Sequence, residues 1–156
     1  VPVRIAERRG CDRYPIDPSS PEGEVTLLSY VWADQLERVA LLRGAIALAR
    51  RLPVAVEEAS AASWVAAQLL RSVHAVASVV FHSIFMQYLG DDERERFVRE
   101  VEEAGQRATG DAPLAWLRME PGAEGAEVRL KTWPAGEDQL VATSGFHGRP
   151  VRWLAD

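Results

Sequence analysis

Hydrophobic and polar positions follow two different periods along the chain, and the change of period divides it into two regions. In the first two thirds, amphipathic stretches with helical spacing follow short apolar runs. The clearest stretch covers residues 92–108, where Phe97, Val98 and Val101 recur at helical spacing and most other positions are charged. Strands and helices are therefore expected to alternate here, as they do in parallel sheets with crossover helices.

Proline and acidic residues help to place the predicted elements of this region. Pro53 ends a helix that begins at Asp34, and Glu57 and Glu58 occupy the first turn of the next helix. The expected strands cover residues 3–6, 54–56, 75–81 and 114–119, and the expected helices cover residues 34–51, 59–71 and 92–108, with an earlier helix that begins near Thr26.

The last third of the chain has a period of two. In residues 126–133, Val128 and Leu130 alternate with Arg129 and Lys131, which predicts a half-exposed antiparallel strand. Two further strands, residues 139–143 and 151–154, follow after glycine- and proline-rich turns. The predicted fold class is therefore α/β, a three-layer sandwich with a mixed sheet and an antiparallel carboxy-terminal meander.

Length, charge and cysteine content restrict the kind of protein. A chain of 156 residues that is 47% hydrophobic can form one domain with a real core, so a single α/β domain over residues 1–156 is expected. A net charge of -5, with both signs spread along the chain, argues against nucleic-acid binding. The opening segment has no apolar region typical of a signal peptide or membrane span, and a lone Cys11 fits a reducing cytoplasm. A cytoplasmic protein without membrane contact is expected.

Polar residues stand at the ends of three predicted parallel strands. Asp12 follows the first, the pair His82 and Ser83 ends the apolar run 75–81, and Glu120 ends the run 114–119. Ligands of open α/β sheets bind beyond the carboxyl ends of the strands, so these residues are expected to converge with His147 on one crevice that binds a small molecule. The alternative is that they only cap strands, and that His82 is a buried histidine with its hydrogen bonds satisfied.

Two other chemistries fit the sequence less well. Ser83, His147 and Glu120 would form a hydrolase triad, but no G-x-S-x-G elbow surrounds Ser83. A metal site that uses His74, His82 and His147 has no supporting ligand spacing, so no metal is expected. The sequence also lacks G-x-G-x-x-G and G-x-x-x-x-G-K-[ST], so no nucleotide phosphate loop is present in these residues.

Several short motifs spread over nearly the whole chain resemble one bacterial family, catalogued as domain of unknown function 2332. The family has no established activity, and its members are about twice as long as this chain. The chain is therefore expected to be the carboxy-terminal half of a longer protein, which also fits a first residue, Val1, that is not methionine. The motifs are Arg9-Gly10-Cys11-Asp12, Ser29-Tyr30-Val31-Trp32, Val79-Val80-Phe81-His82-Ser83, Met119-Glu120-Pro121, Trp133-Pro134-Ala135-Gly136 and His147-Gly148.

The resemblance implies a Rossmann-like fold similar to S-adenosylmethionine-dependent methyltransferases, without the first strand and its glycine loop. It implies that Asp12 lies near the cofactor ribose and that His82 positions or deprotonates a methyl acceptor. S-adenosylmethionine binding is expected only when the missing half is present, and the isolated chain is expected to be inactive. The sheet edge that lacks its partner is expected to form a homodimer.

Overall fold

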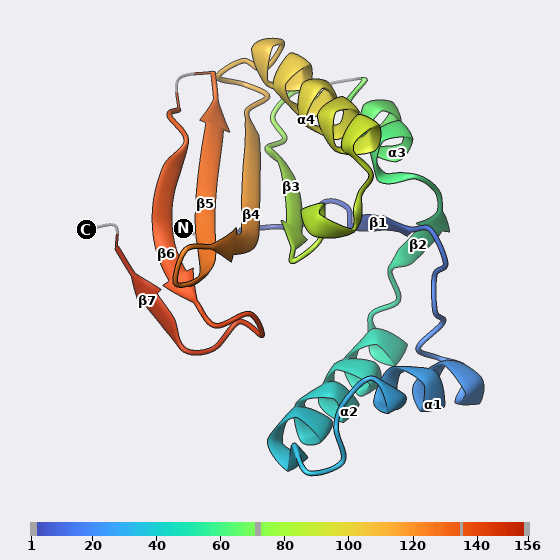
Figure 1. Cartoon of the computed structure of the whole chain (residues 1–156). Helices are drawn as coiled ribbons and strands as arrows, with labels where there is room; N and C mark the ends of the chain where they lie inside the picture. Colours follow the sequence, from blue (N-terminus) through green and yellow to red (C-terminus); the bar gives the residue numbers. More distant parts are fainter. Residues whose placement is uncertain (1–2, 71–72, 135, 155–156) are drawn as a thin grey trace. The chain divides into compact units, whose positions relative to one another are not determined.

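The computed structural model describes residues 3–70, 73–134 and 136–154 (Figure 1). The chain divides into two compact units, Val1–Ser60 and Ala61–Asp156. Each unit combines one pair of parallel strands with helices, and the second unit adds antiparallel strands. The mixed α/β composition predicted from the hydrophobic pattern is therefore confirmed.

The first unit consists of a two-stranded parallel sheet and two helices. Strand β1 (Arg9–Asp12) pairs with strand β2 (Ala55–Glu58). Helices α1 (Pro21–Ser29) and α2 (Leu36–Arg51) come between these strands in the sequence. Asp12 is the last residue of β1, so its predicted place at the carboxyl end of a strand is confirmed.

Both strands of this unit lie later in the sequence than predicted. The first strand is at residues 9–12 and not at the more β-prone residues 3–6, because its main chain pairs with β2 over four residues. Glu57 and Glu58 belong to β2 and do not start a helix. The Arg9 side chain donates to Glu57 at 2.6 Å, so the carboxylate that suggested a helical first turn instead links the two strands.

The first helix also starts earlier than predicted, at Pro21 and not near Thr26. The Ser20 hydroxyl accepts a hydrogen bond from the N–H of Gly23 at 2.9 Å, which satisfies one of the free donors at the start of the helix. Proline is favoured at the first helical position because its fixed φ suits the helix and it has no N–H to satisfy. The second helix, predicted at 34–51, is confirmed within two residues.

The second unit contains a five-stranded sheet and two helices, and a short 3-10 helix follows its first strand. The sheet has the order β3-β4-β5-β6-β7; β3 and β4 are parallel, and all later neighbours are antiparallel (Figure 1). The predicted carboxy-terminal meander is therefore confirmed. The elements are α3 (Ala61–Leu69), β3 (Ser78–Ser83), η1 (Met86–Tyr88), α4 (Asp91–Gln106), β4 (Leu114–Gly122), β5 (Gly125–Trp133), β6 (Gln139–Ser144) and β7 (Val151–Trp153).

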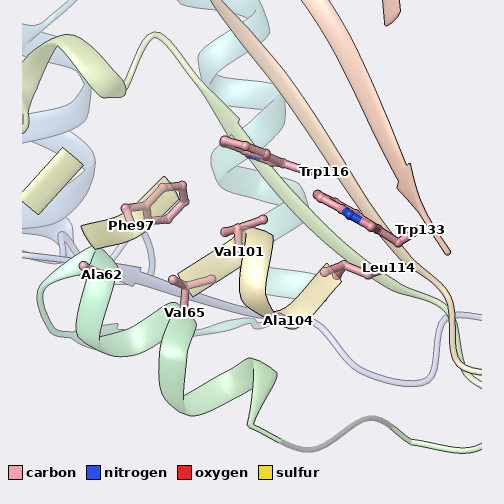
Figure 2. Close-up of a cluster of buried hydrophobic side chains, with 8 residues drawn as sticks. All are labelled: Ala62, Val65, Phe97, Val101, Ala104, Leu114, Trp116 and Trp133. Carbon is pink, nitrogen blue, oxygen red and sulfur yellow. The ribbon is translucent and has the colours of Figure 1, made fainter. Parts of the chain in front are cut away.

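Helix α4 packs against β4 and β5, and α3 packs against α4, to form the core of the second unit (Figure 2). The apolar face of α4 was predicted correctly, and the helix covers Asp91–Gln106 where 92–108 was expected. The predicted end of α3, at Arg71, lies outside the described residues. The buried residues of this cluster are Ala62, Val65, Phe97, Val101, Ala104, Leu114, Trp116 and Trp133.

The other face of the five-stranded sheet carries exposed apolar side chains. Residues alternate between the two faces of a strand, and Val79 and Phe81 of β3 are 63% and 64% exposed. Within the described part of the second unit, helices cover one face of this sheet only. A mixed α/β fold is established, whereas the three-layer Rossmann-like arrangement stays a prediction.

Candidate functional site

Two of the predicted site residues meet where the parallel pairing of β3 and β4 ends, at Ser83 and Met119. His82 lies opposite Arg118 in the parallel pairing, and Glu120 follows two residues later on the same face of β4. The Nδ1 atom of His82 lies 2.7 Å from Oε1 of Glu120. The two side chains are only 8% and 17% exposed. Two side chains that are 38 residues apart in the sequence thus share one shielded hydrogen bond.

Glu120 also holds the loop that follows β3. Its carboxylate oxygens accept hydrogen bonds from the main-chain N–H groups of Phe85 and Met86, at 3.1 to 3.3 Å. The chain turns at Ile84, whose φ of 47° lies in the left-handed region that β-branched residues rarely adopt. The N–H of Ile84 donates to the carbonyl of Met119 at 2.7 Å. The strained turn is therefore held by main-chain bonds to β4 on one side and by the Glu120 carboxylate on the other.

The hydrogen bonds of His82 determine its tautomer. Trp116 Nε1 lies 2.9 Å from His82 Nε2, and an indole N–H can only donate. Nε2 must therefore accept, so the single proton of the neutral imidazole is on Nδ1 and is donated to Glu120. Both ring nitrogens are engaged, which corresponds to the alternative of a buried histidine with its hydrogen bonds satisfied.

Burial keeps this imidazole neutral. Removal from water lowers the pKa of His82 below its ordinary value of 6.5, and the positive charge of Arg118 acts in the same direction. The hydrogen bond to Glu120 and its negative charge act in the opposite direction but do not outweigh burial. Aromatic rings surround the imidazole, with centroid separations of 5.3 Å to Phe85, 5.6 Å to Phe97 and 5.9 Å to Trp116. His82 is thus part of the contact between helix α4 and the sheet.

The lowered pKa of His82 gives a testable dependence of stability on pH. Below pH 6.5 the unfolded chain binds a proton at this position while the folded chain does not. The contribution of His82 is therefore complete above pH 6.5 and decreases as the pH falls toward the pKa of the folded state. Urea unfolding of the wild type and of His82→Asn, measured between pH 5 and pH 8, should show a steeper loss of stability at low pH in the wild type. Parallel curves would contradict the assignment.

A second polar cluster lies on the same face of the sheet and connects β4 with β5. Arg118 stacks over the Trp116 ring, with the guanidinium carbon 4.4 Å from the ring centroid, and donates to Asp138. Asp138 also accepts from Arg129 at 3.2 Å. Burial alone raises the pKa of Asp138, but the two guanidinium groups together lower it below its usual value. The Arg118 Nη1 atom is buried and has no hydrogen-bond partner in the described part of the chain. No motif or periodic pattern marks Asp138, because it lies in a turn region between two strands.

The structure does not bring Ser83 and His147 to the pair formed by His82 and Glu120. Ser83 follows His82 directly in β3, so its side chain points to the opposite face, where it is exposed. His147 is exposed in the turn between β6 and β7. In the described residues, neither side chain forms a hydrogen bond. The three groups of the hydrolase alternative are therefore not joined in this structure.

Asp12 belongs to the first unit and has a local role there. Its Oδ1 atom accepts a hydrogen bond from the N–H of Tyr14 at 2.7 Å, and its main-chain carbonyl accepts from Ala59 at 3.0 Å. These bonds shape the turn that follows β1 and connect it to the end of β2. The convergence of Asp12 with the residues of the second unit on one crevice stays a prediction.

The described residues contain no metal-binding group, and one of their cavities lies away from His82 and Glu120. No set of three or more His, Cys, Asp or Glu side chains in these ranges is placed to hold a metal ion. A cavity of about 110 Å³ lies at the opposite ends of the strands, where Ser78 and Leu114 begin β3 and β4, and is lined there also by Leu69, Arg107 and Ala108. This cavity is separated from His82 and Glu120 by the length of the strands.

Comparison with known proteins settles the family. The sequence profile of the bacterial family DUF2332, described as "Uncharacterized protein conserved in bacteria", matches residues 1–153. The chain belongs to this family. The match confirms the resemblance drawn from the short motifs of the sequence. No curated protein and no solved structure matches the chain. Among the described helices of this DUF2332 chain, none is long and apolar enough to cross a membrane.

Proposed function

We propose that the chain provides one wall of a small-molecule site in a DUF2332 protein that resembles S-adenosylmethionine-dependent methyltransferases. The observation that carries the proposal is the fixed group at the end of the parallel pairing of β3 and β4, where Glu120 binds both His82 and the loop that follows β3. Ligands of parallel α/β sheets bind at this end of the strands. A strained turn at Ile84, held in place by several hydrogen bonds, is typical of functional loops.

In this proposal, His82 and Glu120 are positioning residues. Each nitrogen of His82 already has a partner, and Glu120 receives bonds from one imidazole and two amides. A proton acceptor in this geometry would have to break one of these bonds first. The pair therefore determines where the main chain at residues 84–86 lies, and that main chain forms the wall of the site. Of the two roles expected for His82, positioning or deprotonating a methyl acceptor, this proposal keeps positioning.

Asp12 is the described residue that best fits a nucleoside ligand. It ends a parallel strand, its side chain is exposed, and its Oδ1 atom is already fixed by the Tyr14 amide. A carboxylate at the end of such a strand can accept hydrogen bonds from ribose hydroxyls. The bound S-adenosylmethionine would supply a methyl group on a sulfonium sulfur. The part of the protein that would hold its remaining groups is expected before residue 1.

The cofactor proposal is tested with a longer form of the protein that includes the sequence before residue 1. Isothermal titration calorimetry with S-adenosylmethionine should give a saturable heat for this form, and Asp12→Asn should weaken binding about tenfold, the loss of one charged hydrogen bond. The variant Asp17→Asn is the control, since the Asp17 carboxylate accepts its hydrogen bonds from the main chain and side chain of Ser19 in its own loop. No heat at millimolar ligand would refute the cofactor proposal.

A second candidate is a binding module without catalysis, which the full engagement of His82 favours. In that case, His82→Asn and Glu120→Gln should each lower the free energy of unfolding. The ligand affinity of each correctly folded variant should stay unchanged. In the first candidate, the same variants also weaken ligand binding at a temperature where they are fully folded.

The hydrolase alternative is tested with a fluorophosphonate probe, which should leave Ser83 unlabelled.

A further inference from the structure

Strand β3 forms one edge of the five-stranded sheet and has a sheet partner on one side only. The N–H of Ser78 donates to the carbonyl of Pro113, the residue before β4. The N–H of Ile84 donates to the carbonyl of Met119 in β4. Alternate residues of a parallel strand direct their main-chain groups to the same neighbour. Val79, Phe81 and Ser83 therefore direct their N–H and C=O groups away from β4, where no strand pairs with them in the described part of the chain.

The side chains of β3 do not block this edge against pairing with another strand. Natural edge strands are usually blocked by charged residues, proline or bulges, and Ser78–Ser83 contains none of these. Val79 and Phe81 are 63% and 64% exposed on the face that none of the described helices of the second unit covers. The other edge strand, β7, has only three residues and carries Arg152. Strand addition is therefore favoured at β3.

We propose that β3 pairs with β3 of a second copy of the chain. A two-fold axis beside Phe81 would place the two strands antiparallel, so that each Phe81 lies opposite its counterpart and Val79 lies opposite the partner's Ser83. This register pairs all three outward-facing main-chain positions of each strand. The two Phe81 side chains meet on the uncovered face of the sheet, where cross-strand aromatic pairs are favourable.

The sequence of β3 favours pairing with a second copy of the same chain in particular. An antiparallel two-fold pair brings identical residues together at its centre, so a charge there would oppose its own copy. The net charge of the chain is -5, yet Ser78–Ser83 has no Asp, Glu, Lys or Arg. His82 points to the helix-covered face and stays neutral between Glu120 and Trp116, so it adds no repulsion. The proposal is independent of the ligand site, because Val79 and Phe81 face away from His82.

The proposal is tested by sedimentation velocity of the 156-residue chain over a range of concentrations. The expected species at high concentration has twice the mass of the 17.2 kDa chain. Phe81→Lys should keep the chain monomeric, because two like charges then face each other across the axis. Trp153→Lys, on exposed β7, is the matched control and should leave the dimer intact. The reverse result would place the interface at β7 and overturn the proposal.

Hydrogen exchange of the wild type gives a test that needs no variant. The amides of Val79, Phe81 and Ser83 should exchange rapidly at low concentration and slowly at high concentration, while those of Val80 and His82 are protected at both. A monomer at every concentration, with fast or slow exchange at the three edge amides, would refute the pairing. Larger species that grow with concentration would indicate head-to-tail addition and would also refute it.

Discussion

Glu120→Ala is expected to lower the free energy of unfolding of the second unit by about 3 kcal/mol, because it leaves several buried donors without a partner. The carboxylate is 17% exposed and accepts bonds from the His82 ring and the amides of Phe85 and Met86. Loss of one acceptor thus removes bonds at three donors. The turn at Ile84 loses one of its two supports at the same time and keeps the main-chain bond to Met119. Urea unfolding at pH 7, followed by tryptophan fluorescence, measures the change.

The matched control is Glu124→Ala in the adjacent hairpin turn, where the side chain is exposed. Its effect should stay within about 0.5 kcal/mol, as for most surface substitutions. Glu120→Gln separates charge from shape, because the amide keeps one acceptor but places an NH₂ group near other donors. The loss of unfolding free energy in Glu120→Gln should be more than half of the loss in Glu120→Ala. Equal stability of Glu120→Ala and Glu124→Ala would show that the hydrogen bonds of Glu120 contribute nothing to folding.

The position of His82 near the end of β3 could be predicted from the sequence, because an apolar run stops there. Glu120 was expected to follow the end of its strand, but it lies inside β4, which continues to Gly122 through its pairing with β5. The hydrogen bond between His82 and Glu120 could not be predicted, since it depends on the register that places His82 opposite Arg118. The same applies to Trp116, whose indole N–H determines the tautomer of His82. By contrast, strand alternation alone separates Ser83 from His82. This alternation can be applied to the sequence alone, and it already argues against a site that Ser83 and His82 share.

The helices were easier to predict than the parallel strands. Helix α4 has its own periodic signal, so the predicted range differs from the observed Asp91–Gln106 by one or two residues at each end. Strand β1, Arg9–Asp12, has little intrinsic strand preference and forms through its pairing with β2. Long-range pairing has no local signature in the sequence. This explains why the strand was expected at residues 3–6 and why the acidic pair in β2 was assigned to a helix.

Gly105→Ala is expected to destabilise the second unit by about 3 kcal/mol, through overpacking in the core. Gly105 is buried near the end of α4, and a Cβ atom there would lie well inside 3.0 Å of three atoms of the Trp133 indole. Trp133 is 9% exposed, and Lys131, held by Glu102 of α4, lies over its ring. The indole therefore cannot move away without breaking contacts on both sides. The helix and the sheet must separate to admit one methyl group.

Gly44→Ala is the matched control, because it makes the same change inside α2 with no atom within 4 Å of the new Cβ. Alanine has a higher helix propensity than glycine, so this variant should gain up to about 1 kcal/mol. The two substitutions thus have opposite expected signs, although helix propensity alone predicts a gain for both. Thermal and urea unfolding of the two variants measure the difference. A gain in stability for Gly105→Ala would mean that α4 does not pack against Trp133 at this distance.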